Sequence, residues 1–190
     1  MGYWGYYVVA RSERPLVELD ALAGARGMTL RTAAADGWQV WACPRAADGD
    51  GGDSGGDSGG DGGAGGDGDV GSMSTLARET GSPALFGYVM DSDCVVVEAA
   101  APESGAWTTC LARTAMADYL GDGGQGLTVD DYFLEPRDAA ERAAAWAAEA
   151  GRVAAEEALA DVLASEPGPV DPLAENILFR LLDRLGVVPL

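Results

Sequence analysis

The chain has 190 residues, with 31 acidic and 12 basic side chains, a formal net charge of −19 and 47% apolar residues. All 12 basic side chains are arginine, because the sequence contains neither lysine nor histidine. The apolar fraction excludes wholesale disorder. The absence of histidine excludes histidine-dependent catalytic arrangements and histidine-containing zinc sites. The absence of lysine excludes a Schiff-base lysine and a phosphate-loop lysine.

Residues 1–47 are predicted to form the β-α-β-β half of a single α+β domain. Aromatic and β-branched residues predict a strand over 3–10, and Pro15 and Gly24 bound a predicted short helix over 16–23. Two apolar stretches, 28–34 and 38–43, flank Asp36-Gly37, a sequence typical of a tight hairpin turn.

Residues 48–71 are rich in glycine and aspartate, with a near-repeat of Gly-Gly-Asp-Ser. We interpret them as a flexible linker or loop, because glycine loses much entropy on ordering and neighbouring aspartates repel one another. A calcium-binding β-roll is the alternative. It needs regularly placed large aliphatic residues, and none lies between Gly49 and Asp69.

Residues 72–127 are predicted to form the α-β-β-β-α half of the same domain, with helices over 72–80 and 112–120 and strands over 84–90, 94–99 and 106–111. From residue 128 onward the pattern is helical. Thr128 and Asp131 resemble a helix cap, and an alanine-rich helix is predicted over 136–165. Pro167-Gly168-Pro169 breaks it, and a last helix with a leucine-rich face runs from about 171 to 186.

These elements predict an α+β fold, in which a mostly antiparallel sheet of about five to six strands packs against helices. The region 128–190 supplies a C-terminal helical hairpin.

Net charge differs along the chain: +1 over residues 1–47, −7 over 48–69 and −13 over 70–190. An acidic surface repels nucleic acid and anionic lipid, since both are polyanions. We therefore expect a basic protein partner, and neither a nucleic acid nor a membrane. The oligomeric state stays open.

Three cysteines without close spacing, Cys43, Cys94 and Cys110, are a poor disulfide framework and are expected to pack in the core. The N-terminus lacks the pattern of a signal peptide, and no apolar run approaches the roughly 18 residues of a membrane span. A cytoplasmic location is the expectation. Arg113 lies three residues after Cys110. For nucleophilic chemistry, its positive charge would have to lower the pKa of that thiol.

Aromatic residues crowd the first strand and its expected neighbour. If one face of the sheet is open, they form a patch of the residue types that are enriched at binding hot spots. If helices cover both faces, they are core. The candidate partner-binding residues are Tyr3, Trp4, Tyr6, Tyr7, Trp38, Trp41 and Phe179, the last of which is expected to point away from the leucine face of its helix.

Carboxylates are the remaining chemical resource. Asp91 and Asp93 flank an expected hairpin tip, and Glu98 lies further along the same ribbon, so these three residues are the candidates for binding a divalent cation or for paired-carboxylate catalysis. The simpler interpretation of Asp-Ser-Asp is turn chemistry, and Asp130 and Asp131 are more simply charges at a helix start. No catalytic residue, bound metal or cofactor is expected.

The leading hypothesis is a non-enzymatic acidic protein-binding module, of the inhibitor or immunity type, for a basic toxin or enzyme. An acidic chaperone or adaptor, or a structural subunit of a larger assembly, is the first alternative. A carboxylate-based or divalent-metal-dependent enzyme is the second.

Overall fold

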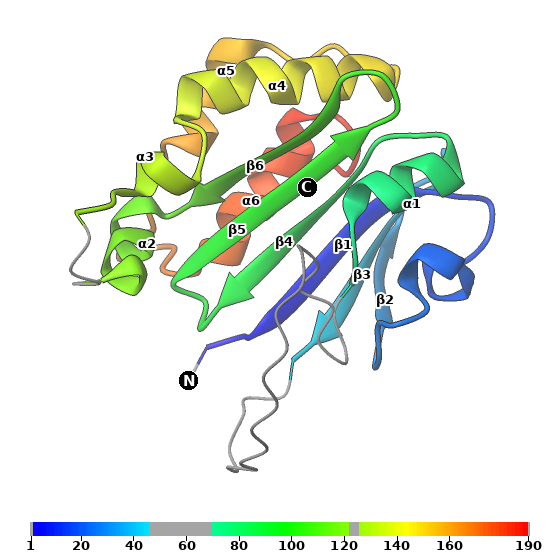
Figure 1. Cartoon of the computed structure of the whole chain (residues 1–190), viewed down its shortest axis with the longest axis horizontal. Coiled ribbons are helices and arrows are strands. Elements are labelled where there is room, and N and C mark those ends of the chain that lie inside the picture. Colours follow the sequence, from blue (N-terminus) through cyan, green and yellow to red (C-terminus); the bar gives the residue numbers. More distant parts are fainter. Residues whose placement is uncertain (1, 46–69, 122–125, 190) are drawn as a thin grey trace.

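The computed structural model describes residues 2–45, 70–121 and 126–189. In this part of the chain, six strands form one antiparallel sheet with the order β2-β3-β1-β4-β5-β6 (Figure 1). The strands are β1 (Gly5–Arg11), β2 (Thr29–Ala33), β3 (Trp38–Pro44), β4 (Ala84–Met90), β5 (Cys94–Ala101) and β6 (Gly105–Leu111). The predicted α+β class and antiparallel sheet are confirmed.

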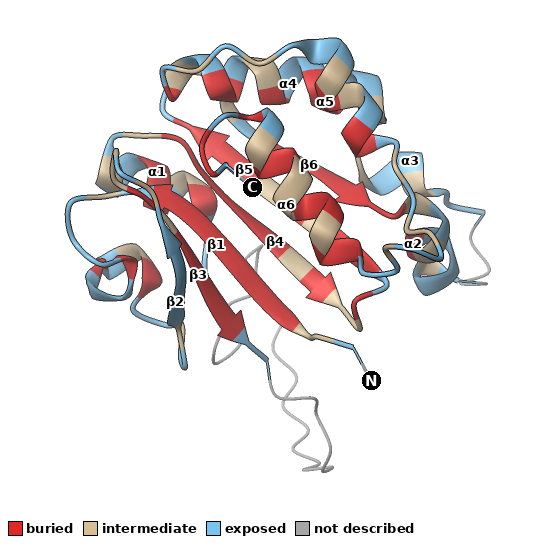
Figure 2. Cartoon of the chain, turned by 180° about the vertical axis from the view of Figure 1, so that it is seen from behind, coloured by how far each residue is buried: buried red, intermediate tan, exposed pale blue. Residues whose placement is uncertain are grey.

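Helices cover both faces of this sheet (Figures 1 and 2). They are α1 (Met73–Thr80), α2 (Arg113–Leu120), α3 (Val129–Tyr132), α4 (Pro136–Glu149), α5 (Glu156–Leu163) and α6 (Ala174–Arg184). One core lies between the sheet and α4, α5 and α6, and a smaller core lies beneath α1 on the other face. Both faces of the central strand β1 are therefore buried.

The larger core is organised around two tryptophans. The indole Nε1 of Trp146, on α4, donates to the carbonyl oxygens of Ala84 at 3.1 Å and Ala100 at 3.0 Å. Its ring lies 5.7 Å from that of Trp38, on β3, measured between centroids. Since a buried indole N–H without a partner is costly, these two acceptors explain how α4 can place a tryptophan over the strands.

The single helix expected over 136–165 is wrong, because the chain forms α4 and α5 instead. Gly151 has a φ of +75°. The N–H groups of Gly151 and Arg152 donate to the carbonyls of Ala148 and Ala147, respectively. This is the Schellman arrangement that ends many helices at a left-handed glycine. The expected helical hairpin is matched only loosely, by contacts of α5 with both α4 and α6.

The helix expected over 16–23 is also corrected, to two 3₁₀ turns at Leu16–Glu18 and Asp20–Leu22. Leu16, Leu19 and Leu22 are buried at a spacing of three residues, which is the 3₁₀ period. Of the expected linker over 48–71, residues 48–69 lie outside the described part of the chain. Its end is described, and there Val70 is fully buried in the smaller core.

Candidate functional site

Four of the expected partner-binding aromatics belong to the core. Tyr6 and Tyr7 are each 6% exposed, Trp38 is fully buried and Trp41 is 9% exposed. Tyr6 and Tyr7 point to opposite faces of β1, so each joins a different core. We correct the expectation accordingly, because side chains this deeply covered offer a partner no surface in this conformation.

The other three aromatics are half-buried and pack on neighbouring rings. Tyr3 lies 5.0 Å from Tyr7, Phe179 meets Tyr7 edge-on at 5.1 Å, and Trp4 meets Tyr119 edge-on at 6.3 Å, measured between centroids. Phe179 therefore packs onto the sheet, contrary to the expected orientation. The pKa values of Tyr3 and Tyr7 are raised, and the largest cause is the burial of the two phenols. Both phenols therefore stay protonated at neutral pH.

Two of the three candidate carboxylates of the β4–β5 ribbon, those of Asp91 and Glu98, have separate backbone partners, whereas Asp93 contributes its backbone N–H to the turn by donating to the carbonyl of Met90. Asp91 accepts a 2.6 Å hydrogen bond from the N–H of Gly2, and Glu98 accepts one of 3.3 Å from the N–H of Met73 at the start of α1. Asp91 and Ser92 have φ values of +53° and +58°, which is turn geometry. Within the described residues, no group of three or more His, Cys, Asp or Glu side chains is arranged to hold a metal ion.

All three thiols are buried and free of disulfides. Burial raises the pKa of Cys110 to about 11, although the neighbouring guanidinium of Arg113 lowers it. Burial, with Cys110 nearby, raises the pKa of Cys94 to about 12. Both groups are therefore thiols at neutral pH, and not the thiolates that nucleophilic chemistry requires.

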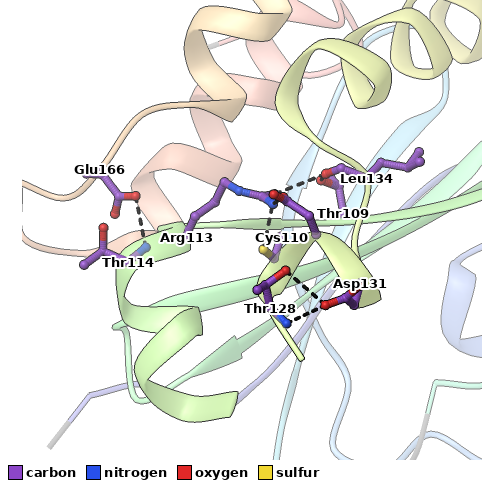
Figure 3. A network of polar contacts seen from close by, with 9 residues as sticks. Thr109, Cys110, Arg113, Thr114, Thr128, Asp131, Leu134 and Glu166 are labelled. Carbon is purple, nitrogen blue, oxygen red and sulfur yellow. Dashed lines mark hydrogen bonds and ion pairs between the residues drawn. The ribbon is translucent and has the colours of Figure 1, made fainter. Parts of the chain in front are cut away.

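Arg113 ties the edge of the sheet to α3 (Figure 3). Its Nη1 lies 3.7 Å from the sulfur of Cys110 and donates to the carbonyl of Leu134 at 3.1 Å, while its Nη2 pairs with Asp130. The Leu134 carbonyl also accepts a 2.9 Å hydrogen bond from the hydroxyl of Thr109, on β6. Arg113, the candidate for lowering the pKa of the Cys110 thiol, thus holds the start of the helical region against the edge of the sheet.

The cap expected at Thr128 is confirmed. The carboxylate of Asp131 accepts hydrogen bonds from the N–H of Thr128 at 2.6 Å and from its hydroxyl at 3.1 Å, and the reciprocal contact completes a capping box. The N–H of Leu134 donates to the carbonyl of Thr108, on β6. The segment from 128 to 135 is thereby fixed beside the outer strand of the sheet.

A groove of about 780 Å³ opens between this segment, β6 and the first turns of α4. We call it the β6 groove. Five carboxylates and one guanidinium line it. The carboxylates belong to Asp130, Asp131, Glu135, Asp138 and Glu141, and the guanidinium to Arg142. The groove is therefore strongly negative.

Some of the charged side chains of the β6 groove have hydrogen-bond or ion-pair partners, and others have none. Arg142 donates from Nη2 to the carbonyl of Ala106, on β6, at 2.9 Å. Asp130 and Asp131 have the partners described above, whereas the side-chain carboxylates of Glu135, Asp138 and Glu141 make no hydrogen bond or ion pair with any other described residue. Three exposed carboxylates thus remain available on one side of the groove.

Two aromatic side chains complete the β6 groove. Trp107, on β6, is 5% exposed, and its Nε1 is buried without a hydrogen-bond partner in the described part of the chain. Tyr132, on α3, is 52% exposed. Neither was predicted as a site residue, because the two side chains come together only when the 128–135 segment lies against β6. The one available signal was Tyr132 itself, an aromatic residue directly after two aspartates.

Comparisons with known proteins match no family model, no curated protein and no solved structure. Among the described residues, no helix combines the length and the apolar character that crossing a bilayer requires. The β6 groove, with five carboxylates and an exposed tyrosine, is the surface feature of this chain that bears most directly on function.

Proposed function

We propose that this chain is a non-enzymatic binding module for a basic protein, of the inhibitor or immunity type. The observation that carries the proposal is the surface around the β6 groove. Residues 128–166 hold ten acidic and three basic side chains. The exposed Tyr132 lies among them, and tyrosine is among the residue types that contribute most at protein interfaces.

Acidic surfaces of this kind favour fast association with a basic partner, because long-range attraction raises the rate of productive encounters. The attraction is screened by salt over about 8 Å at physiological ionic strength. The partner's affinity and association rate should therefore fall together as salt is added.

The protonated thiols and the separated carboxylates of the β4–β5 ribbon support binding over catalysis. A nucleophile needs an activating base or a lowered pKa, and paired-carboxylate chemistry needs two carboxylates converging on one point. Neither condition is met by the thiols of Cys94 and Cys110 or by Asp91 and Glu98.

Affinity capture from a lysate of the encoding organism, at 50 and 500 mM salt, tests the proposal when each captured protein is then purified and titrated by calorimetry. We expect a basic partner that binds with one-to-one stoichiometry and dissociates at high salt. If that partner is an enzyme, stoichiometric addition of the chain should suppress its activity. Purified partners that are acidic, or that bind equally well at both salt concentrations, would count against the proposal.

A further inference from the structure

We infer that the β6 groove binds a short arginine- or lysine-bearing peptide segment of the partner. The inference rests on the proposed function and deepens it by naming the contact point. Three features of the groove carry it: unpaired carboxylates, an unsatisfied indole N–H and an exposed tyrosine.

The first feature is charge on one side of α4. Asp138 and Glu141, three residues apart, lie on one side of α4, and Glu135 precedes the helix as its N-cap residue. None of the three carboxylates has a partner among the described residues, and the guanidinium of Arg142 already donates to the carbonyl of Ala106. A cationic side chain entering the groove therefore meets carboxylates that need not first give up another contact.

The second feature is the indole of Trp107. Burying an N–H without an acceptor costs roughly 1–3 kcal/mol. The side chain is 95% covered and lines the groove, and no other described residue supplies an acceptor to its buried Nε1. A ligand that carries an acceptor would satisfy this donor once the ring turns towards the groove. A peptide has carbonyl oxygens as well as cationic side chains, whereas a bare metal ion or a simple polyamine has no acceptor to offer.

The third feature is Tyr132, which is 52% exposed beside the carboxylates. The face of an aromatic ring attracts a guanidinium or ammonium group, and arginine is the more frequent partner. The volume of about 780 Å³ lies within the range of pockets for ligands of a few hundred daltons. The groove thus suits one or two side chains and their backbone, with the rest of the partner outside.

The probe for a test is a fluorescein-labelled heptapeptide of alternating alanine and arginine, followed by fluorescence anisotropy at 50 mM salt. The groove variant is the triple change Glu135→Gln, Asp138→Asn and Glu141→Gln. Its matched control is the triple change Glu156→Gln, Glu157→Gln and Asp161→Asn on α5, which removes the same charge from exposed positions outside the groove. Circular dichroism and thermal melting verify that both variants are folded.

We expect the groove variant to bind the probe at least tenfold more weakly, and the control variant less than about threefold more weakly, because local carboxylates interact more strongly than distant screened ones. Trp107→Phe keeps an aromatic ring but removes the N–H donor, and should lower the affinity for the probe by about three- to tenfold. A probe with citrulline in place of arginine should lose most of its affinity.

Equal weakening by the two triple variants would overturn the inference, and so would a wild-type chain that leaves the probe unbound. Either result leaves the proposed function to its own test, since a basic protein could still dock on another part of the acidic surface. Loss of the captured partner's binding in the control variant, with the groove variant unaffected, would identify that other part.

Discussion

The hydroxyl of Ser92 donates a 2.9 Å hydrogen bond to the carboxylate of Glu175, 83 residues later in the chain. Glu175 is 8% exposed, and its second carboxylate oxygen has no partner in the described part of the chain. The Ser92 Oγ also accepts the N–H of Tyr3 at 2.8 Å, and the Ser92 carbonyl accepts the N–H of Ala174 at 2.8 Å. One turn residue thus joins the approach to β1, the β4–β5 turn and the start of α6.

Ser92→Ala should lower the free energy of unfolding by about 1–3 kcal/mol, because it leaves a buried carboxylate and the N–H of Tyr3 without their shared partner. Ser92→Gly should cost less than Ser92→Ala, since glycine tolerates the positive φ at this position. Chemical denaturation measures both. Ser165→Ala, which removes only a hydrogen bond to Asp161 within the C-terminal turn of α5, is the control. A Ser92→Ala variant as stable as that control would contradict the proposed role.

Gly87 allows α6 to approach the sheet closely. A Cβ at this position would overlap Cδ2 of the fully buried Leu178, on α6, and lie 3.1 Å from Cγ1 of Val95. Gly87→Ala should therefore destabilise the fold by about 1–3 kcal/mol through overpacking.

The control for Gly87→Ala is Gly168→Ala, where an added Cβ meets nothing within 4 Å. The double variant with Leu178→Ala should show a favourable coupling energy, because the smaller residue makes room for the new methyl group. Strictly additive losses in a denaturation cycle would argue against the overlap.

Stability should depend on Glu149 in the acid range. Burial raises the pKa of Glu149, but hydrogen bonds from Ser104 and from the N–H of Glu103 outweigh it and bring the pKa below its usual value. The carboxylate therefore contributes stability above the pKa of the unfolded chain and loses it as pH falls through the lower, folded pKa.

Glu149→Gln should reduce the free energy of unfolding by about 0.5–1 kcal/mol at pH 7, a modest value because the group is partly exposed. The difference from wild type should shrink below about pH 4. Denaturation curves between pH 3 and 7, with Glu13→Gln as a control at an exposed position, measure it. A difference that stays constant over this range would contradict the mechanism.

The buried thiols should react slowly. Because the pKa of Cys94 is about 12 and that of Cys110 about 11, iodoacetamide at pH 8 should leave both unmodified in the native chain and label all three cysteines in guanidinium. Because the folded pKa values are raised, the protonated thiols contribute to the free energy of unfolding in full below about pH 9, and this contribution is lost as pH rises through the folded pKa values. Rapid native labelling, read by mass spectrometry, would disprove the burial.

The strands were predictable where local signals agree. Aromatic and β-branched residues lie between turn sequences, and the structure places hairpin turns at both Asp36-Gly37 and Asp91-Ser92-Asp93. The end of α4 could not be predicted because alanine-rich segments lie before and after the break at Gly151, so composition alone favoured a continuous helix. A single glycine in a left-handed conformation overrode that propensity.

The candidate site was harder to predict, because it depends on contacts between distant segments. Whether Tyr6 and Tyr7 face a partner or a core depends on where α1 and α6 pack, and no local pattern in β1 encodes that. The β6 groove requires Leu134 to lie against Thr108, 26 residues earlier, through a backbone hydrogen bond. The acidic character of the C-terminal region was visible in the sequence, but its concentration at one edge of the sheet was not.

The strand order has a consequence for how the chain folds. β4, β5 and β6 follow one another from residue 84 to 111 and pair as neighbours, and β1, β2 and β3 all lie before residue 45. The two groups join through one seam, in which Gly5 pairs with Val89 and Ala10 with Ala84. Local pairings close short loops and form quickly, whereas a seam between residues about 80 apart closes late. We therefore expect two early three-stranded units, with formation of the β1–β4 seam as the rate-limiting step.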